Sequence, residues 1–303
     1  MNRYRYSDTP APGGPVAGTA VCVLNGAAGA MRDAAVRQRV ETEMRALSIP
    51  LIEASAGGAD LAGIISDPRV RTVIACGGDG TVNQVVNAMD HRRQRLAVLP
   101  GGRGNSVARD LGVGRMGVAL ARLRTGAETR LDAMSVVLRR NTGAETALMA
   151  VHAVAFGVLP DVVRRARRKS RAGAYGYVVS ALINRSRAEA FEITVDDKAV
   201  PVIPRVGVIA LNTRHLSFHR PCKVARPDDG VLNLVLQPSG LVAEKFAEAT
   251  MIAGFHAVGT RQYPFRALRM VPPVAMALYL DGEIIEDVAD VNVRVLPQAI
   301  AAL

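Results

Sequence analysis

A loop with three closely spaced glycines constrains this chain more than any other feature of its sequence. Gly77, Gly78 and Gly80 lie between an apolar run at residues 73–76 and a stretch whose apolar residues recur at helical spacing. Glycine permits positive φ angles and a close approach of the backbone to a ligand. Thr81 and Gln84 have the spacing of a capping box, which predicts that a helix begins there. A helix N-terminus beside such a loop favours a bound phosphate.

Asp79 lies in the middle of this glycine loop. Its carboxylate would repel a phosphate unless it organised a Mg²⁺ ion or accepted a proton from a hydroxyl group. A surface aspartate in an ordinary strand-to-helix turn is the alternative interpretation. The run GGDGT followed by a helix is, however, far more specific than a single GxGxxG pattern. We therefore predict that Asp79 takes part in chemistry at a bound phosphate.

Two common nucleotide-binding loops are excluded. The chain has no Gly-Lys dipeptide, which a Walker A loop requires, and Asn83 occupies the place of the third glycine of a Rossmann fingerprint. The phosphate-binding loop must therefore belong to a different family.

The hydrophobic pattern of the sequence changes near residue 131. A chain of 303 residues is also long enough to favour two domains. Before this point short apolar strands alternate with helical patterns, which predicts an α/β domain with a mostly parallel sheet. After it, alternating β-branched stretches predict a second, β-sandwich-like domain, with helical inserts near residues 161–188 and 241–255. We expect a disordered leader at residues 1–17, a nucleotide-binding domain at 18–131 and a β-rich domain at 132–303. The C-terminal segment of the latter can pack back on the first domain.

A second glycine loop follows the first by about twenty residues, at LPGGRGNSVARDLG, residues 99–112. Together with GGDGTVNQVVNAM, this segment resembles the diacylglycerol kinase catalytic domain, whose family includes diacylglycerol, sphingosine and bacterial lipid kinases. NAD kinases share only the first loop. The resemblance extends over nearly the whole chain after the leader, and it implies an ATP-dependent lipid kinase.

The resemblance also implies the residues of a nucleotide site. Asn25 belongs to a segment similar to the family's NPxSG turn, and Ser55 lies where a threonine usually contacts ATP. The implied contacts to ATP are Asn25, Ser55, Gly77, Gly78, Asp79, Gly80, Thr81, Val82, Asn83, Gly102, Arg103 and Asn105.

Two further motifs complete the implied chemistry. The segment RPDDGVL is similar to the family's DGxLD segment, which holds a structural Mg²⁺ through the carboxylate of Asp229 and the carbonyls of Arg226 and Val231. Glu283 matches the glutamate of a DGE motif that is the proposed proton acceptor. Without the resemblance, residues 280–283 could equally form a plain hairpin turn. Phosphoryl transfer nevertheless needs a group that orients or deprotonates the hydroxyl, and Glu283 supplies one.

The chain departs from the family pattern at Gly26, Gln84, Arg103 and Ser106. These changes leave the acceptor lipid open, with diacylglycerol and a sphingoid base as candidates. A soluble NAD kinase-like enzyme and a non-catalytic nucleotide- or lipid-binding protein remain the alternatives.

The net charge of +11, carried mostly by arginine, favours phosphate-bearing partners. The run RRARRKSR at residues 164–171 fits docking on an anionic membrane or, equally well, a solvated helix face. The scarcity of aromatic residues argues against a nucleic-acid partner. Three widely spaced cysteines and the lack of a long apolar run favour a cytoplasmic enzyme that associates peripherally with membranes. A homodimer is an open alternative to a monomer.

Overall fold

The computed structural model describes residues 19–54, 61–168, 188–216, 220–222, 224–238 and 260–303. Its backbone divides into two compact units. Unit 1 comprises the chain up to Leu131 together with Gln298–Leu303, and unit 2 comprises Asp132–Pro297.

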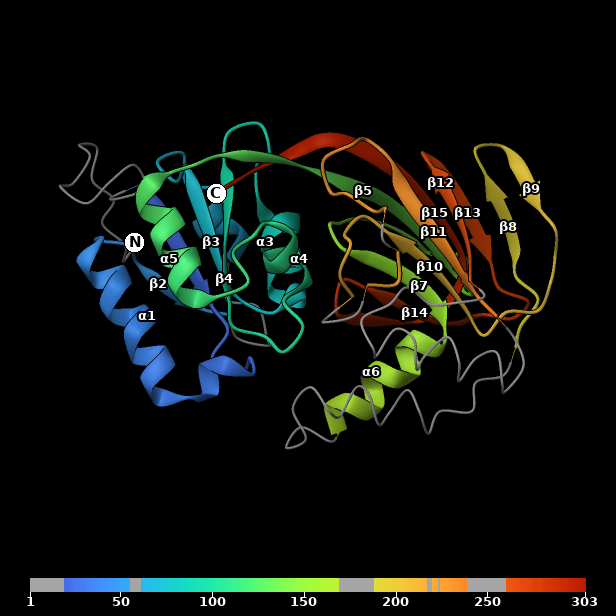
Figure 1. Cartoon of the computed structure of the whole chain (residues 1–303), viewed down its shortest axis with the longest axis horizontal. Helices are drawn as coiled ribbons and strands as arrows, with labels where there is room; N and C mark the ends of the chain where they lie inside the picture. The colour runs from blue at the N-terminus through green and yellow to red at the C-terminus, as the bar shows by residue number, and fades with distance from the viewer. Residues whose placement is uncertain (1–18, 55–60, 169–187, 217–219, 223, 239–259) are drawn as a thin grey trace. The chain divides into compact units, whose positions relative to one another are not determined.

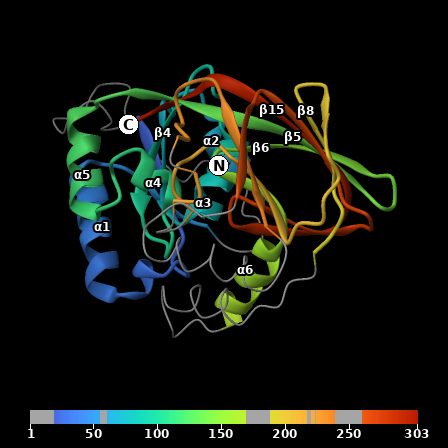
Figure 2. The same ribbon diagram turned by 45° about the vertical axis from the view of Figure 1, so that its right-hand side comes forward.

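Unit 1 is built on a parallel sheet in the order β2-β1-β3-β4, and the end of β15 adds beside β4. Figures 1 and 2 show α1 and α5 on one side of this sheet and α3 and α4 on the other. The elements of this unit are β1 (Ala20–Leu24), η1 (Ala30–Arg32), α1 (Ala34–Ala46), β2 (Leu51–Glu53), α2 (Leu61–Ile65), β3 (Thr72–Gly77), α3 (Asp79–Ala88), β4 (Arg95–Pro100), α4 (Ser106–Asp110) and α5 (Met116–Thr125).

Local sequence explains where these elements begin and end. The carboxylate of Asp33 accepts hydrogen bonds from the backbone N–H groups of Ala35 and Val36 and so caps α1. Strands β1 and β3 are buried along their whole length, as expected for a parallel sheet covered on both faces. The mostly parallel α/β fold predicted for this part of the chain is confirmed.

Unit 2 is rich in antiparallel strands, which confirms the strand-rich second part of the predicted fold. One path runs β12-β11-β10-β7-β14-β15, and β13, β8 and β9 follow from β15. The elements are β5 (Thr129–Arg140), β6 (Glu145–Ala150), β7 (Ala153–Gly157), α6 (Val158–Arg168), β8 (Glu192–Val195), β9 (Lys198–Val200), β10 (Gly207–Leu211), β11 (Leu232–Gln237), β12 (Arg261–Phe265), β13 (Ala267–Val271), β14 (Met276–Leu280) and β15 (Glu283–Ala302). Strand β5 begins in unit 1, and β15 ends there.

Alternation along β7 shows how unit 2 makes its core. Val154 and Phe156 point into a large apolar cluster in which Phe156 stacks on Phe191 with ring centroids 6.1 Å apart. Ala153 and Ala155 point to the other face, where Val163 of α6 packs against them. The helical insert expected at residues 161–188 therefore begins earlier, at Val158, and residues 169–187 lie outside the described part of the chain. The whole of the second expected insert, at residues 241–255, lies there too.

Candidate active site

The two glycine loops of unit 1 are in direct contact. Strands β3 and β4 are adjacent and in register at their ends, with Gly77 opposite Pro100. The backbone N–H groups of Gly101 and Gly102 then both donate to the carbonyl oxygen of Gly77, at 2.8 and 3.1 Å. The carboxyl ends of two parallel strands thus bring both loops to one edge of the sheet.

Glycine is needed here for close packing. A Cβ atom on Gly102 would lie 2.4 Å from the Cα of Gly78, and one on Gly77 would lie 2.3 Å from the Thr81 hydroxyl. A Cβ on Gly101 would lie 3.1 Å from the Cα of Gly77. Gly77, Gly78 and Gly80 do not use the positive φ angles that glycine permits. Close contact between the two loops explains the glycines at positions 77 and 102.

Helix α3 begins three residues earlier than the capping box predicted, since the box makes Thr81 the N-cap. Its first residue is Asp79, and its N-cap is Gly78, which provides no side-chain hydrogen bond. Thr81 is consequently inside the first turn and buried, while Gln84 is exposed. The capping-box prediction is wrong because extended backbone at Gly78 lets the helix start directly after β3. The first N–H groups of α3 therefore have no side-chain cap, which suits an anionic ligand.

The turn after β1 joins the two loops. The side-chain amide of Asn25 donates to the Thr81 hydroxyl at 3.0 Å, and its backbone N–H donates to the carbonyl of Cys76. The N–H of Ala30 donates to the carbonyl of Gly101 at 2.8 Å. Three segments that the resemblance assigned to a nucleotide therefore lie together in unit 1.

The carboxylate of Asp79 caps the next helix. Its Oδ1 atom accepts a hydrogen bond from the backbone N–H of Val107, in the first turn of α4, at 3.1 Å. No hydrogen bond from the described residues reaches the other carboxylate oxygen. Asp79 thus links the two loops through one oxygen and can offer the second to a ligand.

Asn105 shapes the second loop from within. Its backbone is left-handed, with φ of 51°, which asparagine tolerates better than most residues. Its side chain accepts from the N–H of Gly102 at 2.8 Å and donates to the same residue's carbonyl at 2.9 Å. Arg103 packs its aliphatic stem against the first turn, since a Cβ on Gly29 would lie 3.0 Å from the Cγ of Arg103. The second loop is therefore fixed by its own side chains.

Three other expected nucleotide residues contribute differently. Val82 and Asn83 are buried in α3, and Gly80 lies in its first turn. Val82 packs in the core of unit 1, so only its backbone is suited to a ligand. Ser55 lies outside the described residues.

In unit 2, Glu283 follows a tight hairpin. Asp281 and Gly282 have φ angles of 47° and 100°, and Leu280 pairs with Glu283 across the turn. Residues 280–283 therefore form the plain hairpin turn that the sequence allowed, with two residues in the loop and the positive φ angles of a primed turn. Glu283 is exposed at the first position of β15. The hairpin and an exposed carboxylate thus occur together.

Asp281 is a residue that sequence reasoning left without a role. It is fully buried, and its carboxylate accepts hydrogen bonds from the N–H groups of Val151 (2.6 Å), His152 (2.9 Å) and Ala153 (2.8 Å). Buried carboxylates of this kind are stable only when fully hydrogen-bonded. Asp281 therefore holds the turn that carries Glu283 against the start of β7. Its position directly before Gly282 in a tight turn was the only signal in the sequence.

His152 continues this buried polar group. The hydroxyl of Thr213 lies 3.0 Å from the carbonyl oxygen of His215 and 2.6 Å from the Nδ1 atom of His152, so hydrogen bonds join these three residues. The buried Nε2 atom has no hydrogen-bond partner among the described residues.

The expected metal loop is also in unit 2. The carboxylate of Asp229 accepts from the N–H of Val231 at 3.1 Å, and the neighbouring Gly230 N–H donates to Asp132 at 2.6 Å. Burial raises the pKa of Asp229, and the nearby charges of Asp132 and Asp228 raise it further. A divalent cation would relieve this repulsion.

Carbonyl oxygens are suitable partners for such a cation, and Arg226 and Val231 supply backbone carbonyls in the same loop. Within the described residues, no group of three or more His, Cys, Asp or Glu side chains is placed to hold a metal. The donor set of this loop, one carboxylate with backbone oxygens, is chemically suited to Mg²⁺.

The start of the basic run is engaged inside unit 2. Arg164 donates to Asp161 at 3.1 Å and to Glu286, and these partners raise its pKa, Glu286 first. Arg164 is therefore held by carboxylates on its own unit. Residues 169–171 lie outside the described chain. Among the described helices, none has the length and apolar character that crossing a bilayer requires.

Comparison with known proteins finds a family model that covers both glycine loops. Residues 19–136 match the model of the diacylglycerol kinase catalytic domain. No curated protein matches the sequence.

Solved structures from Bacillus anthracis str. Sterne have the same fold. Two structures of a protein provisionally assigned as a diacylglycerol kinase have TM-scores of 0.75 and 18% identity; each covers 94% of this chain, and the chain covers 96% and 94% of theirs. A third, described as a diacylglycerol kinase, has a TM-score of 0.72 and 18% identity over 94% of this chain and 96% of that one. At this identity the likeness shows the fold alone.

Proposed function

Because residues 19–136 match the model of the diacylglycerol kinase catalytic domain, we propose that the chain is an ATP-dependent lipid kinase. It would transfer the γ-phosphoryl group of ATP to a hydroxyl of a membrane lipid, such as diacylglycerol or a sphingoid base. The observation that carries the proposal is the contact between Gly77–Gly78 and Gly101–Gly102 beside the uncapped N-terminus of α3.

The N–H groups at the start of α3, beside this contact, are where a nucleotide's phosphates would bind. Backbone N–H groups at a helix N-terminus, together with the helix dipole, bind anions without further charge. Asn25 and Thr81, joined by their own hydrogen bond, complete the polar side of the loop. Arg103, on the second loop, adds a guanidinium group, whose planar fork of N–H donors matches phosphate oxygens.

Asp79 is suited to organising a Mg²⁺ ion, which would neutralise charge on the phosphates when bound. Its Oδ1 atom is fixed by Val107, so the carboxylate is held in one orientation before any ligand arrives. Such preorganisation lowers the cost of reaching the reactive arrangement.

Glu283 would act on the acceptor hydroxyl. It accepts the hydroxyl proton as the lipid oxygen forms its bond to the γ-phosphorus, and the bond from that phosphorus to the β–γ bridging oxygen breaks to release ADP. Asp281 would serve this step indirectly, because its three hydrogen bonds fix the turn on which Glu283 stands.

Incubation of the protein with γ-labelled ATP, Mg²⁺ and a total lipid extract tests the proposal. We expect label in a lipid product and its loss by roughly 100-fold or more in both Asp79→Asn and Glu283→Gln. Asparagine at position 79 keeps an oxygen for the Val107 N–H, so circular dichroism should show a folded variant.

Two results would contradict the proposal. Full transfer by both variants would remove the roles of Asp79 and Glu283. Labelled NADP formed from NAD in lipid-free buffer, without any labelled lipid, would identify a soluble NAD kinase instead.

A further inference from the structure

A second cationic site lies in unit 1, at the opposite edge of the parallel sheet. An open surface pocket of about 370 Å³, called the arginine cavity below, is lined by Arg71, His91, Arg92, Arg93, Gln94, Arg95, Glu128, Arg130 and Ala301. Arg71 directly precedes β3, and Arg95 is the first residue of β4. The glycine loops follow the other ends of these strands. Six residues at about 3.3 Å each place the two edges roughly 20 Å apart.

The strand register builds one wall of this cavity. Arg95 pairs with Thr72 of β3 on one side and with Ala301 of β15 on the other. The N–H of Arg95 also donates to the carbonyl of Arg71 at 2.8 Å. Adjacent parallel strands therefore deliver both guanidinium groups to the same edge.

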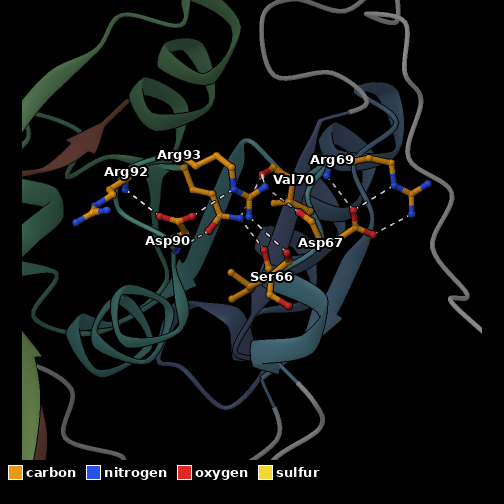
Figure 3. A network of polar contacts seen from close by, with 9 residues as sticks. Ser66, Asp67, Arg69, Val70, Asp90, Arg92 and Arg93 are labelled. Carbon is orange, nitrogen blue, oxygen red and sulfur yellow. Dashed lines mark hydrogen bonds and ion pairs between the residues drawn. The ribbon is translucent and has the colours of Figure 1, made fainter.

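The turn before β4 forms a second wall, and it is rigidly held. The buried Gln94 side chain donates to the carbonyls of Ile65 and Val70, at 2.6 and 3.2 Å, and accepts from the N–H of Asp90 at 3.0 Å. Figure 3 shows Arg93 between this turn and the turn at residues 66–70, whose carbonyls it contacts, while Arg92 extends away from both. The turn's geometry is thus fixed without a ligand.

The cavity carries unbalanced positive charge. Among the described residues, five arginines line it against one carboxylate, that of Glu128. Within the same residues, the ion pairs of Glu128 are long, 3.9 Å to both Arg95 and Arg130. Arg93 is engaged by Asp90 and backbone carbonyls, whereas the guanidinium of Arg71 has no hydrogen bond or ion pair with any described residue. Like charges gathered in one pocket repel one another, and a bound anion would offset that repulsion.

His91 adds an imidazole ring to the lining of this site. Its Nδ1 atom is buried and has no hydrogen-bond partner among the described residues, although the ring lines the cavity. Burial lowers the pKa of His91, with the backbone of Val86 and the charge of Asp90 opposing that effect.

The size and lining of the cavity limit the ligand. Its volume lies near the lower end of small-ligand sites, which span about 300–1,000 Å³. Most such sites have apolar walls, but this one is lined by charged and polar side chains. Guanidinium groups match the oxygens of a phosphoryl group in charge and in planar geometry.

We propose that this arginine cavity binds a phosphoryl group, separately from the nucleotide site. The group belongs either to a soluble phosphate compound or to the headgroup of an anionic lipid, because both present the same oxygens. The site lies outside the proposed kinase chemistry and does not depend on it.

Binding of inorganic phosphate and of vesicles tests this assignment on the full chain, without nucleotide or Mg²⁺. The pocket variant is Arg71→Gln/Arg95→Gln. The control is Arg39→Gln/Arg45→Gln, which removes the same charge from exposed positions on α1. Calorimetry measures phosphate affinity, and co-sedimentation measures binding to phosphatidylglycerol vesicles against phosphatidylcholine vesicles.

We expect the pocket variant to weaken phosphate or vesicle binding at least about tenfold and the control to change it less than about twofold. Phosphate binding lost alone identifies a soluble ligand, and vesicle binding lost alone identifies a lipid headgroup. Glu128→Gln should tighten binding about threefold, because it removes the opposing carboxylate.

Equal effects of the pocket and control variants would overturn the proposal, since they would reflect net charge alone. Binding of neither probe by the folded wild-type protein would overturn it as well. If the double variant folds poorly, Glu128→Gln still tests the proposal. An unchanged or weakened affinity of the Glu128→Gln protein would also contradict it.

Discussion

Gly102 shows how strongly a single position can depend on the absence of a side chain. A Cβ there would lie 2.4 Å from the Cα of Gly78 and 3.1 Å from its nitrogen. Both neighbours are backbone atoms, so the loops would have to separate. Separation would break the hydrogen bonds that the N–H groups of Gly101 and Gly102 donate to the carbonyl of Gly77, and these bonds hold the candidate phosphate site together.

Gly102→Ala should therefore lower the affinity for Mg·ATP at least about tenfold and destabilise unit 1 by roughly 1–3 kcal/mol. Calorimetry and urea unfolding measure the two effects. Gly117→Ala is the matched control, because its Cβ would be 3.6 Å from Arg39 at an ordinary contact distance. That helical substitution should stabilise by up to about 1 kcal/mol. Unchanged nucleotide affinity in Gly102→Ala would contradict the close-packing explanation.

The hairpin between β14 and β15 is the element on which the proposed proton acceptor depends. Its turn contains a fully buried carboxylate, Asp281, with three backbone N–H donors from residues 151–153. Each donor loses its partner if the carboxylate is removed. The resulting penalty is that of several unsatisfied buried groups.

Asp281→Ala should destabilise the protein by about 3 kcal/mol or more, measured as a shift of the urea unfolding curve. Asp281→Asn should cost less, since one oxygen remains. The control is Asp287→Asn, at an exposed position of β15 with a φ of 61° that asparagine tolerates, and it should change stability by less than about 0.5 kcal/mol. A neutral effect of Asp281→Ala would show that the turn does not rely on this carboxylate.

The same elements show what the sequence could and could not reveal. Hydrophobic periodicity and the glycine runs identified β3, α3 and β4 and the proximity of their loops, because parallel strands end at one edge. The start of α3 was misplaced, because the capping-box spacing of Thr81 and Gln84 is a local signal. The structure instead fixes Thr81 through Asn25, 56 residues away.

Two further features were not predicted because they depend on residues far apart in the sequence. The buried role of Asp281 depends on residues about 130 positions earlier, and the arginine cavity combines three strand edges and a turn. Neither pattern exists in any short window of sequence. The alternation of β7, by contrast, follows directly from its period of two.

At the scale of the whole molecule, metal binding links chemistry to stability. Burial and the charges of Asp132 and Asp228 raise the pKa of Asp229. The folded state therefore holds that proton more tightly than the unfolded chain does. The associated stability is present below the raised pKa and is lost as pH rises through it. A cation bound to the ionised carboxylate would replace the proton.

Mg²⁺ should consequently raise the Tm more near pH 7.5 than near pH 4, where the proton competes for Asp229. Differential scanning fluorimetry with and without Mg²⁺ measures this difference. In Asp229→Asn the pH-dependent part of the Mg²⁺ effect should disappear. An identical Mg²⁺ response in the variant would place the stabilising cation elsewhere.

The proposed kinase activity of the whole molecule depends first on the nucleotide site in unit 1. Its glycine loops and the N-terminus of α3 would hold the terminal phosphates, so affinity should depend on how many phosphates the ligand carries.

Calorimetric titration of the wild-type protein with ATP, ADP and AMP, each with Mg²⁺, is the most direct test. We expect one site per chain, with affinity falling by at least about tenfold at each phosphate removed. Equal affinities for the three nucleotides, or no heat of binding from a folded protein, would contradict a phosphate-holding role for these loops.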